Sequence, residues 1–199
     1  ELKLDYLCIV AAILHDCIED TSVTNEDVKN EFGEQVAHIV EGVSKLTSLE
    51  FTSSSQKQAQ NFQKLILAMS KDMRVMIIKL ADRLHNMRTI GSMTEEKRVQ
   101  KAKETSELHA PIARRLGLHS IGVELDDLCF QTLHPRKHLI IKRKINKQYG
   151  NQKKTINLIK SEIESRLKFE QIVATVEGRQ KEPSSVYNKM KIKSRKFSE

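Results

Sequence analysis

Most of the first 134 residues alternate between apolar and polar positions with the period of an α-helix. Apolar side chains recur every three or four positions from Leu4 to Ile18, from Val36 to Leu46 and from Val75 to Met87, which is the spacing of one helix face. Another helix is expected over about 56–69. Consecutive apolar residues at 75–78 indicate deep burial. The pattern therefore predicts an all-helical front half.

Capping and stop residues mark several helix ends. Thr24 and Asp27 form a capping-box pattern before a short helix that Gly33 can end. Asp72 is expected to open the most apolar helix. Pro111 lacks a backbone N–H, so a helix break is predicted there, with a new helix following.

The pattern changes at Pro135, a residue that suits the first turn of a helix. Two basic helices are expected, over about 136–148 and 152–168, with a glycine between them. β-Branched residues then predict a strand at about 171–177, and Ser184 can cap a last helix. The predicted fold class is mainly α, followed by the start of an α/β unit.

Charge divides the chain at the same place. The net charge is +8, of which residues 1–134 contribute −4 and residues 135–199 contribute +12. A basic segment favours polyanions such as nucleotide phosphates or RNA. A solvated helix face is the alternative explanation of the same charge. The division suggests two functional units.

Cysteine usage and hydropathy favour a cytoplasmic protein. Cys8, Cys17 and Cys129 are odd in number and lack metal-ligand spacing, which is typical of reduced thiols. Cys8 lies on the apolar face of the first helical pattern, so it is expected in the core. No apolar run approaches the roughly 20 residues of a membrane span. The absence of a starting Met suggests a fragment.

Four polar residues close the first helical pattern: His15, Asp16, Glu19 and Asp20. Steps of four residues place them on one side of a predicted helix. Carboxylates on a buried face repel one another and lose hydration, and a divalent cation bound by imidazole and carboxylate removes both costs. The alternative is a solvated helix end.

A second polar site, the run ADRLHN at 81–86, interrupts the most apolar helix. Asp82 and Asn86 share one face of that helix. A metal ion shared with the His-Asp pair would supply the partner that a buried aspartate needs. An ion pair with Arg83, or another internal salt bridge, is the alternative. His85 points elsewhere and is expected to be structural.

Four segments resemble the hydrolase domain of the RelA/SpoT family, which is similar to the wider HD phosphohydrolase group. They are AAILHDCIEDT, KLADRLHNMRT, APIARRLGL and ELDDLCF. The resemblance implies a hydrolase domain over 1–134 with a bound Mn²⁺ ion. The roles carried over by motif are metal ligand for His15, Asp16 and Asp82, water activation for Glu19 and Asp20, and nucleotide contact for Asn86 and Thr89.

Two features depart from the family pattern. The family's first His ligand lies on a helix upstream of the His-Asp pair, outside this sequence, so the hydrolase domain is expected to be truncated at its N-terminus. Around APIARRLGL, where the family usually has an aromatic residue and a His, this sequence has His109 and Arg114. That difference is expected to affect packing only.

Gly178, Arg179 and Lys181 follow the predicted strand, and Ser185 and Lys189 lie in the expected last helix. This basic rear segment resembles the start of the RelA/SpoT synthetase domain. A glycine loop before a helix N-terminus lets phosphate approach the backbone, although a solvated basic loop is the alternative. The resemblance implies a connector over 135–170 and a synthetase start over 171–199. The residues matched to ATP phosphate contacts are Arg179, Lys181, Ser185 and Lys189. The Mg²⁺ ligands of that domain are not in this sequence, so no synthetase activity is expected.

These features predict metal-dependent removal of the 3′-pyrophosphate from guanosine tetra- or pentaphosphate, in part of a bifunctional GTP pyrophosphokinase and hydrolase. One alternative is another HD-family nucleotide phosphohydrolase. Others are a non-catalytic nucleotide- or ribosome-binding helical module and a regulatory remnant that binds the alarmone without cleaving it. Ribosome or tRNA contacts would use regions outside this sequence, and no membrane partner is expected.

Overall fold

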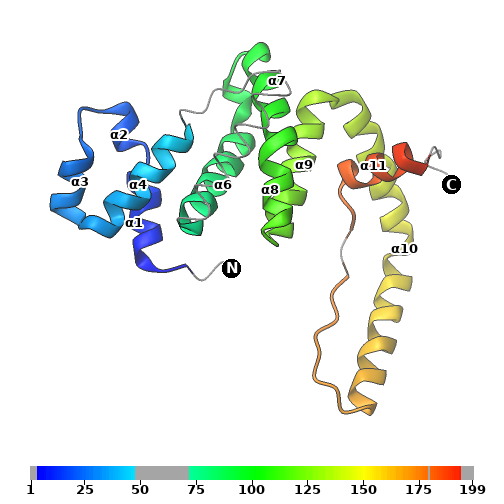
Figure 1. Ribbon diagram of the computed structural model, residues 1–199. Coiled ribbons are helices and arrows are strands. Elements are labelled where there is room, and N and C mark those ends of the chain that lie inside the picture. The colour runs from blue at the N-terminus through cyan, green and yellow to red at the C-terminus, as the bar shows by residue number, and fades with distance from the viewer. Residues whose placement is uncertain (1–3, 48–71, 179, 194–199) are drawn as a thin grey trace.

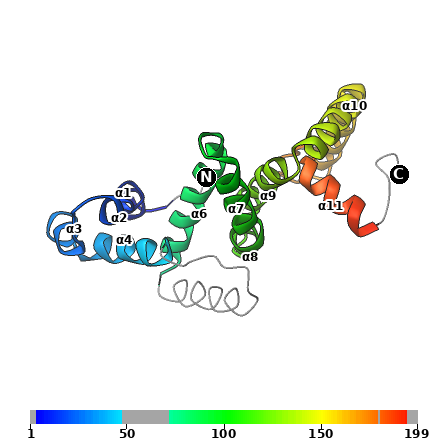
Figure 2. The same ribbon diagram turned by 90° about the horizontal axis from the view of Figure 1, so that it is seen from above.

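The computed structural model describes residues 4–47, 72–178 and 180–193, and every regular element in these ranges is helical. The elements are α1 (Tyr6–Leu14), α2 (Cys17–Asp20), α3 (Asn25–Phe32), α4 (Glu34–Thr47), α6 (Met73–Arg88), η1 (Ile90–Ser92), α7 (Glu95–Glu104), η2 (Thr105–His109), α8 (Ala110–Arg115), α9 (His119–Leu133), α10 (Pro135–Phe169) and α11 (Pro183–Lys193). Three groups of helices, α1–α4, α6–α8 and α9–α11, follow one another along the molecule (Figures 1 and 2). The mainly helical class is confirmed, and the helix expected over 56–69 lies outside the described residues.

The first apolar pattern forms two helices instead of one. Asp5 caps α1 by accepting a hydrogen bond from the N–H of Cys8 at 2.9 Å. Cys8 is buried in the core, as predicted. Helix α1 ends before His15 and Asp16, and α2 begins after them, so the prediction of one continuous helix through 15–20 is wrong. Four-residue spacing fixes a common face only where the helical hydrogen bonds continue, and here they do not.

The predicted capping box of α3 is confirmed. Thr24 Oγ1 accepts from the N–H of Asp27 at 3.2 Å, and the Asp27 carboxylate accepts from the N–H of Thr24 at 2.8 Å. The helix stops at Gly33, whose φ of +88° lies in the region that favours glycine. These ends hold α3 against α4.

Helix α6 runs through the main hydrophobic core. Asp72 caps it, as predicted, by accepting from the N–H of Arg74 at 2.9 Å. Helix α4 packs closely on it at Gly42. A Cβ atom placed on Gly42 would come within 2.8 Å of the Val75 side chain, so only glycine permits this approach. Helix α1 packs on α4 and also contacts α6. This packing brings the two polar motifs toward each other.

A π-helical turn, η2, precedes α8 in place of a simple break. Pro111 lies in the first turn of α8, where its missing N–H breaks no intrahelical bond, so the new helix expected there is confirmed. The wider π turn joins it to α7 without a loop. Helix α8 ends before Gly117, whose φ is +77°.

A single 35-residue helix, α10, replaces the two basic helices predicted from the sequence. Pro135 occupies its first turn, as expected, and its backbone stays helical through Gly150. One glycine costs a helix only about 1 kcal/mol, which does not end it. No described helix, α10 included, is both long enough and apolar enough to cross a membrane. Helices α9, α10 and α11 share a second hydrophobic cluster of Phe130, Ile141, Ile145, Val186 and Tyr187.

Residues 172–178 form no regular secondary structure, although a strand is predicted at 171–177. They run back alongside α10, with Gly178 next to Ile156 (Figure 1). A strand needs a hydrogen-bonded neighbour, and no strand in the described ranges offers one. The strand prediction is therefore wrong for this structure.

Helix α11 is capped by a residue of another helix. The N–H of Ser184 donates to Asp127 Oδ1 at 3.0 Å, and Pro183 opens the helix. His138 Nε2 donates to the other carboxylate oxygen of Asp127 at 3.0 Å. The predicted Ser184 cap is therefore wrong, because Ser184 lies inside the first turn and Asp127 binds its N–H.

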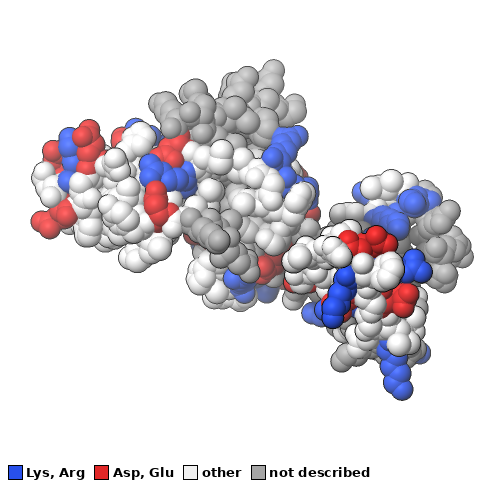
Figure 3. All heavy atoms as spheres, turned by 90° about the horizontal axis from the view of Figure 1, so that it is seen from below, with Lys and Arg blue, Asp and Glu red and all other residues white. Residues whose placement is uncertain are grey.

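Acidic and basic side chains are interspersed on the face shown in Figure 3, also over α10 and α11. Two pairs lie along α10: Lys160 with Glu164 at 3.6 Å, and Arg166 with Glu162 at 3.4 Å. The net positive charge of the rear half is therefore not gathered into one continuous surface on this face.

Candidate functional site

Two residues far apart in the sequence meet where the end of α1 lies against α6. His15 follows the last turn of α1, and Asp82 lies within α6. Nε2 of His15 lies 3.0 Å from Asp16 Oδ1 and 3.7 Å from Asp82 Oδ1. The side chains of His15 and Asp82 are 15% and 14% exposed, whereas that of Asp16 is 60% exposed. The three predicted metal ligands thus approach one another around the His15 imidazole.

The main chain orients the His15 ring. Nδ1 lies 2.8 Å from the carbonyl oxygen of Ala12, and because a carbonyl can only accept, Nδ1 carries the proton. Nε2 is buried and has no hydrogen-bond partner among the described residues. Nε2 therefore faces oxygen atoms of two carboxylates, which carry lone pairs. Such an arrangement is repulsive unless a proton or a cation lies between the groups.

Two neighbours on α6 hold the Asp82 carboxylate. Lys79 Nζ lies 3.0 Å from Oδ2, and Asn86 Nδ2 donates to Oδ1 at 2.7 Å. Arg83 instead pairs with Glu104 at 2.7 Å. The internal salt bridge left open by the sequence therefore exists, with Lys79 rather than Arg83 as its cation.

Lys79 belongs to this site, although it is not among the residues predicted from the sequence. Its side chain is 7% exposed, so its ammonium group needs a partner. A lysine inside an apolar run, three residues before Asp82 and hence on the same helix face, was the available signal. The charge of Lys79 also acts on His109. Burial, followed by the nearby charges of Arg83 and Lys79, holds the pKa of the His109 imidazole well below its usual range.

Glu19 and Asp20, the predicted water-activating residues, lie on α2 and are exposed. Neither carboxylate forms a hydrogen bond or ion pair within the described part of the chain. Their backbone N–H groups both donate to the carbonyl of Asp16, which ties α2 directly to the His-Asp pair. Their catalytic role stays a prediction.

Asn86 and Thr89, the predicted nucleotide contacts, are exposed near the end of α6. The Asn86 amide donates to Asp82, as described above. The Thr89 hydroxyl donates to the carbonyl of His85 at 3.0 Å. His85 is exposed and points away from the core. Nucleotide contact therefore also stays a prediction.

The predicted synthetase residues lie just before α11 or on it, apart from Arg179, which is outside the described residues. Lys181 and Lys189 are exposed, and Ser185 is half-buried. Ser185 and Lys189 are four residues apart on α11, so they share one side of that helix. No hydrogen bond or ion pair joins these three residues in the structure as described.

The donor set around His15 suits a divalent cation but does not enclose one. Across residues 4–47, 72–178 and 180–193, no three His, Cys, Asp or Glu side chains are placed to hold an ion as they stand. His15 has a buried Nε2 and an Nδ1 that is bound to a carbonyl oxygen, which is nevertheless the arrangement that histidine ligands adopt. These residues therefore fit a metal, with its ligand set incomplete.

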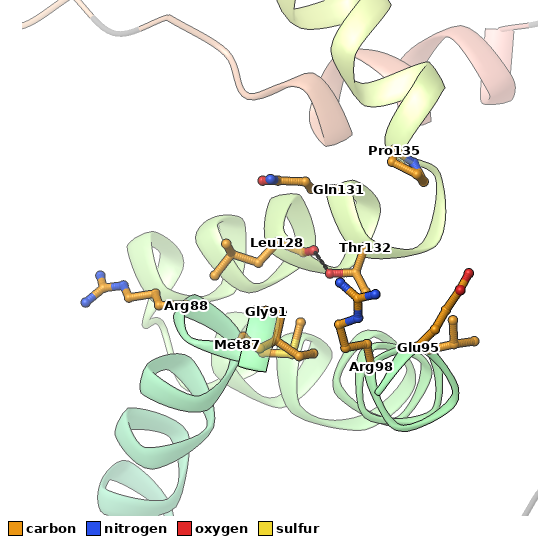
Figure 4. A pocket seen from close by; sticks show the side chains of 11 residues that line it. Met87, Arg88, Gly91, Glu95, Arg98, Leu128, Gln131, Thr132 and Pro135 are labelled. Carbon is orange, nitrogen blue, oxygen red and sulfur yellow. Dashed lines mark hydrogen bonds between the residues drawn. The ribbon is translucent and has the colours of Figure 1, made fainter. Parts of the chain in front are cut away.

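A pocket of about 470 Å³ lies between α6, η1, α7 and α9, away from this cluster (Figure 4). It is lined by residues such as Met87, Gly91, Arg98 and Leu128 and includes none of the predicted site residues. Arg88 also lines it, and its guanidinium group binds Glu124, with Nε 2.6 Å from Oε1. The volume of this pocket therefore does not indicate where the predicted site residues lie.

Comparison with known proteins gives related enzymes along nearly the whole chain. It is 49% identical over 197 residues to the bifunctional (p)ppGpp synthase/hydrolase SpoT of Escherichia coli (strain K12), covering 99% of this chain and 28% of that protein. It is 48% identical over 197 residues to the guanosine-3′,5′-bis(diphosphate) 3′-pyrophosphohydrolase of Haemophilus influenzae, covering 99% of this chain and 29% of that protein. It is 44% identical over 194 residues to a GTP pyrophosphokinase of Myxococcus xanthus, covering 96% and 26% respectively.

The chain therefore spans a little over a quarter of the length of these relatives. The family model described as HD domain matches residues 1–119, which include both polar motifs. The resemblance to the RelA/SpoT family inferred from the motifs is confirmed by the names and the identity of the relatives. The chain thus belongs to the HD domain family.

Proposed function

We propose that the protein removes the 3′-pyrophosphate from guanosine 3′,5′-bis(diphosphate), or from the corresponding pentaphosphate, in a metal-dependent reaction. The observation that carries this proposal is the buried Nε2 of His15, which faces Asp16 and Asp82 without a hydrogen-bond partner among the described residues. The names of the relatives supply the substrate. Because the chain spans 28% of the first of them, the activity of the whole protein is part of the proposal.

His15, Asp16 and Asp82 would hold the ion. Imidazole and carboxylate ligands suit manganese, iron or zinc, and the family resemblance favours manganese. When bound, the ion would lower the pKa of a coordinated water and polarise the 3′ phosphoryl group. A further ligand from an upstream histidine helix, implied by the same resemblance, would complete the set.

The remaining residues would handle water and nucleotide. Glu19 and Asp20, joined to Asp16 through its carbonyl, would position and deprotonate the attacking water. The water oxygen bonds to the phosphorus at the 3′ position, the bond to the ribose 3′ oxygen breaks, and that oxygen leaves with a proton. GDP and pyrophosphate are the products of the tetraphosphate. Asn86 and Thr89, exposed on the same helix as Asp82, would contact the nucleotide.

The rear of the chain belongs to a second unit in this proposal. Residues 1–134 form the hydrolase domain, 135–170 a connector and 171–199 the start of a synthetase domain. Arg179, Lys181, Ser185 and Lys189 would contact ATP phosphates there, with Mg²⁺ held by residues beyond this sequence. The names of the relatives, which include a bifunctional synthase/hydrolase, support this division. Free cysteines favour a cytoplasmic location.

Activity is tested on a version of the protein extended upstream by the helix expected to carry the missing histidine. With Mn²⁺, it is expected to convert the tetraphosphate to equal amounts of GDP and pyrophosphate, and EDTA should stop the reaction. His15→Ala should remove both Mn²⁺ binding and turnover. His119→Ala, at an exposed position in α9, serves as the matched control and should leave both intact. The proposal fails if the Mn²⁺-loaded protein leaves the 3′-pyrophosphate in place.

A further inference from the structure

Lys79 is buried beside the candidate metal ligands. Its side chain is 7% exposed, and its Nζ lies 3.0 Å from Asp82 Oδ2 across one turn of α6. A buried ammonium group is costly unless a carboxylate compensates it. The pair is therefore a fixed feature of the core and not a loose surface contact.

The carboxylate of Asp82 has a donor on each oxygen. Lys79 binds Oδ2, and the Asn86 amide donates to Oδ1 at 2.7 Å. The terminal torsion of an aspartate is broad, so a carboxylate with one donor can still turn. With both donors in place, Oδ1 stays on the side of His15, whose Nε2 lies 3.7 Å away.

We propose that Lys79 is a positioning residue for the metal site: its ammonium group binds one oxygen of Asp82 and thereby keeps the other directed at the ion shared with His15. The inference rests on the proposed metal-dependent function and assigns Lys79 no contact with substrate. The Asn86 amide donates to Oδ1, the other oxygen of the same carboxylate.

The neighbouring cation provides a matched comparison. Arg83 is also on α6, is 9% exposed and forms an ion pair with Glu104 at 2.7 Å. Its side chain forms no hydrogen bond or ion pair with His15 or Asp82 in the described structure. Removing Arg83 therefore breaks a buried ion pair between α6 and α7 without removing a partner of the Asp82 carboxylate.

The experiment measures Mn²⁺ affinity by isothermal titration calorimetry, with thermal unfolding recorded in parallel, on the upstream-extended protein. Lys79→Met is expected to weaken Mn²⁺ binding about 10–100-fold, the usual effect of removing a partner of a metal ligand. Lys79→Arg, which restores a cation, should recover most of that affinity. Arg83→Met should lower the unfolding temperature yet keep the Mn²⁺ affinity of the parent. If Lys79→Met does not fold, Lys79→Gln replaces it, with weaker Mn²⁺ binding again expected.

The outcomes separate the inference from the function on which it rests. Unchanged Mn²⁺ affinity in the Lys79 variants, with affinity lost in Asp82→Ala, overturns the role of Lys79 and leaves the metal site standing. Equal losses of affinity in Lys79→Met and Arg83→Met also overturn it, because the effect would then be one of folding. A parent protein that binds no Mn²⁺ removes the metal site itself and Lys79 with it.

Discussion

Nε2 of His15 lies 3.7 Å from Oδ1 of Asp82, although His15 follows α1 and Asp82 lies far along the sequence in α6. The contact depends on α1 packing on α4 and on α4 packing closely on α6. Main-chain and side-chain partners fix each group: Ala12 orients the imidazole, and Lys79 and Asn86 orient the carboxylate. The site is therefore built by the core itself, which makes its members sensitive to single changes.

Asp82→Ala is expected to abolish Mn²⁺ binding and hydrolysis and to destabilise the protein. It leaves Lys79 buried without its carboxylate, and losing one partner of a buried ion pair costs about 3–5 kcal/mol. The decrease in the free energy of unfolding should lie at the lower end of that range, because the Asp82 side chain is 14% exposed and water can partly solvate the site. Denaturant unfolding and Mn²⁺ titration measure the two effects. Full Mn²⁺ binding by a folded Asp82→Ala protein would rule out Asp82 as a ligand.

Glu19→Gln is expected to slow turnover while leaving Mn²⁺ binding nearly unchanged. Glu19 is exposed on α2 and is assigned to the water, not to the ion. A general base contributes about 10²–10⁴ in rate, so kcat should fall by that order. Stability should not change, since no side-chain partner of Glu19 is recorded in the described structure. Loss of Mn²⁺ binding as complete as in Asp82→Ala would instead make Glu19 a ligand.

Local signals in the sequence predicted helix ends well. The capping box of Thr24 and Asp27, the stop at Gly33 and the cap at Asp72 all depend on residues within a few positions, and all are confirmed. The end of the first helix before His15 was missed, because the apolar pattern continues across it. Hydrophobic periodicity indicates which side of a segment is buried. It does not reveal a turn between two helices that bury the same side.

Long-range features could not be predicted in the same way. The cap of α11 comes from Asp127, far away in the sequence, and no local pattern indicates it. Ser184 was a sound candidate by composition but lies one position inside the helix. The pairing of Asp82 with Lys79 was predictable in principle, because three-residue spacing on a helix brings such side chains together.

His109 is expected to make the protein less stable in acid. Burial, reinforced by Arg83 and Lys79, holds its pKa well below 6.5 in the folded state. In the unfolded chain the imidazole takes up a proton near pH 6.5. The contribution of neutral His109 to the free energy of unfolding is therefore complete above about pH 6.5. As the pH falls below that value, the free energy of unfolding decreases by up to about 1.4 kcal/mol per pH unit.

Free energies of unfolding measured from about pH 7.5 to pH 5 test the role of His109. His109→Gln should flatten the decline below pH 6.5, because glutamine does not titrate. His119→Gln, at an exposed position in α9, should keep the decline of the parent protein. An identical pH dependence in His109→Gln and the parent would show that other groups cause the acid sensitivity.

Asp127→Ala is expected to loosen α11 without unfolding the main core. Asp127 accepts from the N–H of Ser184 and from His138 Nε2, both at 3.0 Å, and both residues are buried. Removing the carboxylate leaves two buried donors unsatisfied, at about 1–3 kcal/mol each. Because α11 packs on a hydrophobic cluster separate from that of α6, the loss should remain local.

Hydrogen exchange resolves this effect of Asp127 by segment. Backbone amides of 184–193 should exchange faster in Asp127→Ala, whereas those of α6 should not change. Asp126→Ala is the matched control, because Asp126 is the adjacent residue on α9 but pairs with Arg114 of α8. It should leave exchange in α11 unchanged. Faster exchange in α6 and α11 alike would mean that Asp127 supports the whole helical assembly and not the attachment of α11 alone.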